Sequence, residues 1–280
     1  MILPGSYANG FAPRDGQPLY PELWRGCVGA WAPCLGPSGL VLREWSGGQN
    51  HGTLVNGASV KPVVGAYAAD FDGTNDHCIV LLSNSSSVLA ALNSNLFSVS
   101  VWVYARSFSN SPVVWSVQSA SGNDSALIEF NSTGTQLYVK TANNALGLTG
   151  ARTYTLSSTV AASTWTHICF IKTGTGDNGN LYVNGVLQTS YTGTLQTCVA
   201  TSAHSMYYGI YFSLLVPLNG AVDSMMIYDR PLESSVVNLL RLRRGIAYEL
   251  APRRRASIQV PGFKAAWLNQ RSQIIGGGLK

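Results

Sequence analysis

Charged side chains are scarce in this sequence of 280 residues, since Asp, Glu, Lys and Arg together make up only 11% of it. Globular domains usually carry about 25%. A disordered chain combines many charges with few apolar groups, whereas 46% of the residues here are apolar. Ser, Thr and Asn fill the polar positions instead. The composition therefore excludes a disordered chain and disfavours a helical protein rich in Glu and Lys.

Long apolar runs are absent as well. No segment approaches the ~18 consecutive apolar residues of a membrane-spanning helix, and residues 1–6 lack the basic and apolar regions of a secretory signal. We expect no membrane partner. Cysteines are odd in number and show no paired metal-type spacing, so we expect most to be reduced and buried. They are Cys27, Cys34, Cys78, Cys169 and Cys198.

The sequence has no motif of a common catalytic site. Glycoside cleavage needs two carboxyl groups that face each other across a cleft, but the five Glu are scattered and no Glu-x-Asp-x-Glu pattern occurs. The four His lack metal-ligand spacing. Gly-x-Ser-x-Gly, phosphate-binding and dinucleotide-binding motifs are missing too. We therefore predict that the protein is not an enzyme.

Short alternating segments separated by Gly-containing turns fill most of the chain. Residues 97–104 alternate strictly, and their odd-numbered residues share one apolar face. Asn184-Gly185 predicts a two-residue hairpin, because both turn positions require positive φ. The pattern predicts an all-β protein built as an antiparallel two-sheet jelly-roll sandwich. Further strands are expected at 27–31, 67–71, 77–82, 112–118, 126–130, 136–140, 153–157, 166–172, 180–183, 186–189, 206–212 and 221–228.

One short helix is predicted after Pro231. Val236, Val237 and Leu240 lie on a helical stripe, and Gly245 is suited to end the helix. The prolines before residue 25 exclude a helix there and suggest an extended strap.

Positive charge is concentrated at the C-terminal end. Residues 1–238 carry a net charge of −3, whereas residues 239–280 carry +8. Two interpretations stay open, a solvated and frayed terminus or a tail that docks on an acidic partner. In the second, the docking residues are Arg241, Arg243, Arg244, Arg253, Arg254, Arg255 and Trp267.

An ordered set of motifs resembles the laminin G-like, concanavalin A-like family. The motifs are Gly26–Trp31, Asn50–Leu54, Asp70–Asp76, Phe97–Val103, Trp165–Ile168, Leu181–Val186 and Asn219–Leu232. The resemblance implies a sandwich of two facing sheets over residues 26–232. An extended strap at 1–25 would precede it, and a short helix with a basic tail at 233–280 would follow.

The resemblance implies that some relatives bind a calcium ion at the rim of the sandwich, near sugar-binding loops. The matching oxygen donors are Asp72, Asn75, Asp76 and Asp223. The second acid that the family often has after the last position is replaced by Ser224. The carboxylates can instead accept backbone N–H groups in tight turns, and we favour this interpretation and expect no cofactor.

These observations favour a non-catalytic structural or adhesion protein of a bacteriophage virion, such as a decoration, fibre or tail-associated protein. The segments Pro21–Cys27 and Ile246–Arg255 resemble phage-associated members of the family. We expect a homo-oligomer, made in the host cytoplasm, whose termini bind other virion subunits and whose body contacts a host-surface glycan.

The alternative is an extracellular carbohydrate-binding module of a bacterium. A third hypothesis is a nucleic-acid contact through the Arg-rich tail, which the net charge of −3 over residues 1–238 disfavours.

Overall fold

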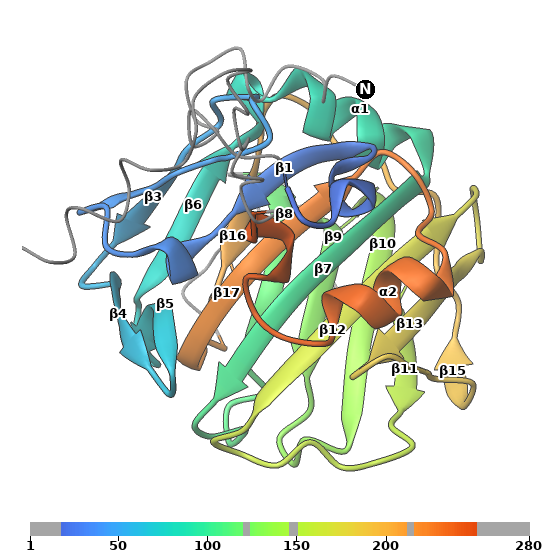
Figure 1. Cartoon of the computed structure of the whole chain (residues 1–280). Coiled ribbons are helices and arrows are strands. Elements are labelled where there is room, and N and C mark those ends of the chain that lie inside the picture. Colours follow the sequence, from blue (N-terminus) through green and yellow to red (C-terminus); the bar gives the residue numbers. More distant parts are fainter. Residues whose placement is uncertain (1–17, 120–123, 146–150, 212–215, 251–280) are drawn as a thin grey trace, which may run out of the picture.

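Two antiparallel sheets pack face to face in the computed structural model, which describes residues 18–119, 124–145, 151–211 and 216–250 (Figure 1). The smaller sheet has eight strands in the order β14-β13-β12-β7-β17-β5-β4, and β1 pairs with β17 in addition. Their bounds are β14 (Val186–Leu187), β13 (Gly179–Val183), β12 (Trp165–Thr173), β7 (Leu96–Ala105), β17 (Asn219–Tyr228), β5 (Ala66–Asp72), β4 (Ser59–Val63) and β1 (Cys27–Trp31).

The larger sheet has nine strands in the order β15-β11-β10-β9-β8-β16-β6-β3-β2. Their bounds are β15 (Tyr191–Gly193), β11 (Ala151–Thr155), β10 (Gln136–Ala145), β9 (Asp124–Phe130), β8 (Val113–Ser119), β16 (His204–Tyr208), β6 (His77–Leu81), β3 (Gly52–Val55) and β2 (Val41–Leu42). The predicted all-β, two-sheet sandwich is thus confirmed.

The main core lies between the two sheets. The odd-numbered residues of β7 from Phe97 to Val103 are all buried in it, as their alternation predicts, and Trp115 and Ile128 of the larger sheet face them. Trp102 and Tyr104, on the opposite side of β7, are half-buried. A sheet with apolar residues on one side of each strand is stabilised by burying that side against a second sheet.

The predicted hairpin at Asn184-Gly185 joins β13 to β14. Both residues have positive φ, 50° for Asn184 and 79° for Gly185, and the flanking Val183 and Val186 are paired. The turn therefore has the backbone that this dipeptide favours.

The described residues contain two α-helices, α1 (Ser86–Ser94) and α2 (Ser234–Leu240), so the prediction of a single helix was wrong. The Ser-rich start of α1 is typical of a loop, but Val88, Ala91 and Leu92 follow a helical spacing and are buried. Short 3-10 turns are η1 (Pro21–Trp24), η2 (Pro33–Leu35), η3 (Leu82–Asn84) and η4 (Ile246–Tyr248). None of the helices in the described ranges is long and apolar enough to span a membrane.

The 3-10 turn η1 corrects the expectation that prolines exclude a helix before residue 25. Pro21 stands at its first position. A missing N–H has no consequence there, because that group would lack a partner within the helix in any case.

A second apolar cluster covers the outer face of the smaller sheet. Leu23 of η1, Val237 of α2 and Ile246 of η4 pack on sheet residues that include Cys169 and Met226. Figure 1 shows α2 lying across this sheet. The last strand of the sandwich, β17, ends at Tyr228, but residues up to Tyr248 pack on the outer face of the smaller sheet and belong to the folded body.

The two described chain ends lie side by side and form a terminal clasp, which comprises residues 18–24 and 246–250. Pro18 and Leu250 form an antiparallel bridge, and the Leu19 N–H donates to the Glu249 carbonyl at 2.7 Å. The Trp24 indole N–H donates to the Ala247 carbonyl at 2.7 Å. The remainder of the predicted strap and tail, residues 1–17 and 251–280, lies outside the described residues.

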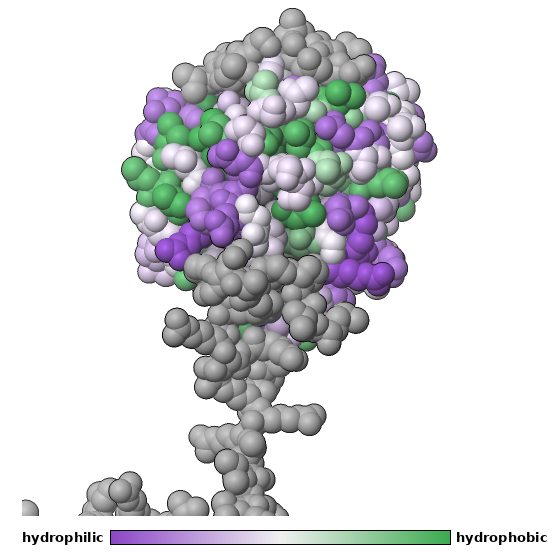
Figure 2. All heavy atoms as spheres, turned by 90° about the horizontal axis from the view of Figure 1, so that it is seen from above, coloured by the Kyte–Doolittle hydropathy of each residue, from purple (hydrophilic) through white to green (hydrophobic). Residues whose placement is uncertain are grey.

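Hydrophobic and hydrophilic residues are intermixed over the face shown in Figure 2. This agrees with a sequence in which neutral polar residues replace charges. The most exposed large apolar side chains, Leu40 and Val64, are 66% and 65% exposed and belong to separate turns.

Candidate functional site

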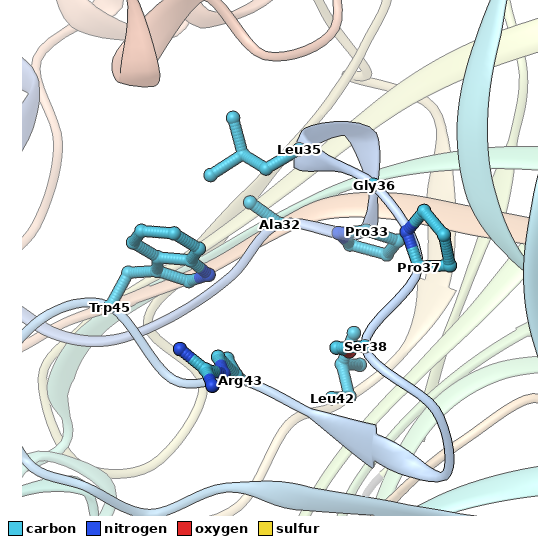
Figure 3. Close-up of a pocket in the computed structure, with 9 residues that line it drawn as sticks. All are labelled: Ala32, Pro33, Leu35, Gly36, Pro37, Ser38, Leu42, Arg43 and Trp45. Carbon is cyan, nitrogen blue, oxygen red and sulfur yellow. The ribbon is translucent and has the colours of Figure 1, made fainter. Parts of the chain in front are cut away.

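A hollow of about 240 Å³ opens on the surface beside η2 and β2 (Figure 3). In Figure 3, Trp45 and Arg43 stand on one side of it and Pro33, Pro37 and Ser38 on the other. Small-molecule sites are typically concave and apolar, with a few polar groups that orient the ligand. The residues that line the hollow are Ala32, Pro33, Leu35, Gly36, Pro37, Ser38, Leu42, Arg43 and Trp45.

All the described residues that line the hollow come from one continuous stretch of chain, residues 32–45, which folds back on itself. Gly36 leaves η2 with φ 116° and Gly39 has φ 70°, and only glycine adopts such angles without strain. The Ser38 hydroxyl donates to the Val41 carbonyl across the turn. The returning segment is held by β3, because the Leu54 N–H donates to the Leu40 carbonyl at 2.8 Å.

Glu44 fixes the direction in which Arg43 and Trp45 point. Its side chain is only 5% exposed, and its Oε1 atom accepts the N–H groups of Ala30 (3.1 Å) and Ser46. Successive side chains of an extended segment point to opposite sides. Because Glu44 is turned inward, its two neighbours are presented together to the hollow.

Trp45 packs against a second aromatic ring, which in turn packs against a third. Its ring lies 6.3 Å from that of Tyr248 in an edge-on arrangement, and Tyr248 lies 5.3 Å from Trp24, also edge-on. Both supporting rings belong to the terminal clasp. The flanking segments of the chain therefore hold one wall of the hollow.

Asp223 holds the opposite wall, although it lies on β17 and is fully buried. Its Oδ1 atom accepts the N–H of Cys34 in η2 at 3.1 Å and the N–H of Ser224 at 2.7 Å. The Arg244 guanidinium lies 3.7 Å from Oδ2 and stacks 3.9 Å above the Trp165 ring. We call this group the Asp223 network (Cys34, Trp165, Asp223, Ser224 and Arg244).

Burial dominates the electrostatics of the Asp223 network. It raises the pKa of Asp223 to about 6, and the attraction of Arg244 opposes the shift without cancelling it. Burial also lowers the pKa of Arg244. Both shifts have the same cause, because removing a charge from water disfavours its charged form.

The residues predicted to share a calcium ion do not form one cluster. Asp72, Asn75 and Asp76 lie together at the turn between β5 and β6. Asp72 pairs with Asn219, so Asp223 lies four residues further along β17, roughly 13 Å away. Among the described residues, no group of three or more His, Cys, Asp or Glu side chains could hold a metal ion.

The hydrogen bonds at the turn between β5 and β6 are those expected if the carboxylates accept backbone N–H groups. Asp72 accepts the Thr74 N–H at 2.7 Å, and Asp76 accepts the Asp72 N–H at 3.2 Å. The pKa of Asp76 is raised, first by burial and then by the negative charge of Asp72. These four residues therefore do not fit a shared calcium site.

The predicted docking arginines fall into three groups. Arg241 bonds to Asn238 and Arg243 pairs with Glu249, both at the surface, so each has a partner within the chain. Arg244 belongs to the Asp223 network, with a side chain only 11% exposed. Outside the described residues lie Arg253, Arg254, Arg255 and Trp267.

Sequence reasoning did not identify Arg43 and Trp45. They follow the Gly36–Gly39 turn and precede a second Gly-rich run, so the stretch resembles an unstructured loop. The alternation of Leu42 and Glu44 with Arg43 and Trp45 was an available signal. Glu44 obscured this alternation, because a charged residue is not expected at a position that faces the core.

Comparison with known proteins places the fold. A family model described as "Concanavalin A-like lectin/glucanases superfamily" matches residues 72–238, which is more than half of the chain. No curated protein matches the sequence.

Three solved structures illustrate the likeness. Domain 4 of AbnA, a GH43 extracellular arabinanase from Geobacillus stearothermophilus in complex with arabinotriose, shares 16% identity, with a TM-score of 0.56 over 76% of this chain and 96% of that domain. Trypanosoma rangeli sialidase shares 14% identity, with a TM-score of 0.56 over 78% of this chain but only 33% of the sialidase. The binding domain of Botulinum neurotoxin DC in complex with SialylT shares 16% identity, with a TM-score of 0.55 over 78% and 52%. At such identities the likeness concerns the fold alone.

Proposed function

The chain belongs to the concanavalin A-like lectin/glucanase superfamily, and on that premise we propose that it is a non-catalytic module that binds carbohydrate in the hollow beside Trp45. The observation that carries the proposal is the indole of Trp45 in the wall of the hollow, which packs on Tyr248, itself packed on Trp24. The C–H face of a sugar ring is apolar and packs against an aromatic face, while its hydroxyl groups need polar partners. The side chains of Arg43 and Ser38, which line the hollow, supply such groups.

The described lining of the hollow supports a binding role over a catalytic one. None of the nine described residues that line it is Asp or Glu, and hydrolysis of a glycosidic bond usually requires a pair of carboxyl groups. Glu44 is the acid next to the hollow in sequence, but its Oε1 atom is bonded to backbone N–H groups inside the fold.

The solved structures support the same ligand class. The arabinanase domain, 96% of which is covered, was solved with arabinotriose. The toxin binding domain was solved with SialylT. A sandwich of this architecture is thus compatible with sugar binding, and the hollow is the place we assign to it here.

The test is calorimetric titration of the full chain with a panel of mono- and oligosaccharides. We expect Trp45→Ala to abolish the binding that the wild type shows. Tyr191→Ala is the matched control, because Tyr191 is an aromatic residue of β15, 45% exposed, that does not line the hollow. Equal binding by wild type and Trp45→Ala, or no binding to any sugar, would contradict the proposal.

We further propose a bacteriophage virion as the setting, with the hollow facing a host-surface glycan. The terminal clasp supports attachment through the termini, since residues 1–17 and 251–280 continue from adjacent points, Pro18 and Leu250. Other virion subunits, and further copies of this chain, would be the partners of these segments. The test is mass spectrometry of purified particles. Recovery from a bacterial culture medium instead would favour an extracellular carbohydrate-binding module.

A further inference from the structure

We propose that the hollow selects a sugar that carries a carboxylate, with Arg43 binding the carboxylate and Trp45 packing against the ring. This inference rests on the proposed carbohydrate-binding function and names the class of its ligand.

The charges around the hollow favour an anionic ligand. Among the described residues that line it, Arg43 is the one that carries a charge, and the walls opposite it are formed largely by Pro33, Leu35 and Pro37. A carboxylate that enters meets a guanidinium and, within the described lining, no acidic side chain. A guanidinium has five N–H donors in a planar fork, so it can bind a carboxylate through two parallel bonds and keep other contacts.

The spacing of the two residues suits one sugar unit. Arg43 and Trp45 are two positions apart on an extended segment, which separates their Cα atoms by roughly 6.5 Å. A ring packed on the indole can therefore reach the guanidinium with a carboxylate attached directly to a ring carbon. The volume of about 240 Å³ lies below the ~300–1,000 Å³ of pockets for drug-sized ligands, which favours a single terminal unit.

The position of Glu44 keeps its negative charge away from such a ligand. Its side chain is buried on the other side of the segment, where Ala30 and Ser46 donate to it. Residues 18–250 carry 11 Lys and Arg against 12 Asp and Glu, a net charge of −1, so the described body as a whole does not attract anions. Selection must then depend on the short-range contact with Arg43. Salt at ~0.15 M screens such a contact less than it screens electrostatic attraction over distances beyond about 8 Å.

Matched sugar pairs test the inference on the full chain. Glucose is compared with glucuronic acid, and galactose with galacturonic acid, since each pair differs by one carboxylate in place of a hydroxymethyl group. We expect the acid of at least one pair to bind ten-fold or more tightly than its neutral partner. We expect Arg43→Gln to remove this preference, so that the two sugars of a pair bind with affinities within two-fold of each other.

Two control variants keep the outcome interpretable. Arg43→Lys keeps the charge without the fork and should retain only part of the preference. Arg241→Gln removes an exposed arginine that does not line the hollow and should change nothing. Unchanged melting temperatures of both Arg43 variants would show that any loss of preference arises in the hollow and not from unfolding.

Several outcomes would overturn the inference. Trp45-dependent binding with equal affinity for acid and neutral sugars would refute it and leave the proposed function standing. Retention of the preference in Arg43→Gln would refute the role of Arg43. Glucose 6-sulfate, included as a third probe, would refute the choice of carboxylate if it bound ten-fold more tightly than glucuronic acid. Failure to bind any sugar would instead overturn the proposed function together with the inference.

Discussion

Asp72 and Asp223 both accept backbone N–H groups, but in opposite surroundings. Asp72 is exposed, and its partner Thr74 is two residues away in the same turn. Asp223 is fully buried, and its partner Cys34 is 189 residues away. The first bond shapes a local turn, whereas the second connects the central strand β17 to the wall of the hollow.

The surroundings also set the energetic consequence of losing each bond. Water replaces the carboxylate at an exposed turn, so the net contribution of such a bond is small. A buried N–H without its acceptor, or a buried cation without its counter-charge, is costly. Contacts between distant segments should therefore dominate both stability and the shape of the hollow, and the following predictions test this contrast.

Truncation of the terminal clasp should have the largest effect. A chain that ends at Gly245 loses the buried Ile246 and Ala247 and the ring of Tyr248, which together should stabilise the fold by roughly 5 kcal/mol. A chain that ends at Leu250 keeps these contacts and serves as the control. Urea denaturation measures the difference, and equal midpoints for the two truncations would show that the clasp contributes nothing.

Asp223→Ala should lower the free energy of unfolding by roughly 3–5 kcal/mol, because Arg244 and two backbone N–H groups lose their partner. Sugar affinity should fall as well, since η2 loses its anchor. Asp223→Asn is the control, as it keeps an acceptor oxygen. A loss below about 1 kcal/mol for the alanine variant would mean that the network is dispensable.

The pH dependence of stability should isolate the carboxyl group of Asp223. Its pKa is about 6 in the folded protein and about 3.9 when unfolded, so the folded state binds the proton more tightly. The resulting stabilisation is complete below about pH 4 and is lost as pH rises through 6, by about 3 kcal/mol. Thermal melts of wild type and Asp223→Asn between pH 4 and 7 should show a steeper loss of stability in the wild type, because Glu129 and Asp76, whose pKa values are also raised by burial, titrate in both proteins. Parallel profiles would contradict the assignment.

The turn at Asp72 should give the smallest effect. Asp72→Ala removes one exposed hydrogen bond and should cost less than about 1 kcal/mol. Because Asp223 lies apart from the turn, chelation by EDTA should leave the melting temperature unchanged. A marked calcium-dependent rise in that temperature, absent from Asp72→Ala, would instead reveal a metal site.

The same contrast explains which features the sequence reveals. The alternation in β7 and the Asn184-Gly185 turn are local patterns, and both predictions were confirmed. Helix α1 was missed because its first residues are serines, which also favour loops. The anchoring of η2 by Asp223 and the support of Trp45 by Tyr248 join segments about 190 to 200 residues apart, a relation that no local pattern encodes.

The bridge between Pro18 and Leu250 also determines how the body would respond to mechanical tension. A force that pulls the two chain ends apart acts first on this bridge and on the bond from Leu19 to Glu249. The strands of the sandwich bear no tension until these contacts rupture. The terminal clasp is therefore the part of the protein that should break first under tension. If it opened under tension, Tyr248 would move away from Trp45, and the proposed sugar site would lose the support of one wall.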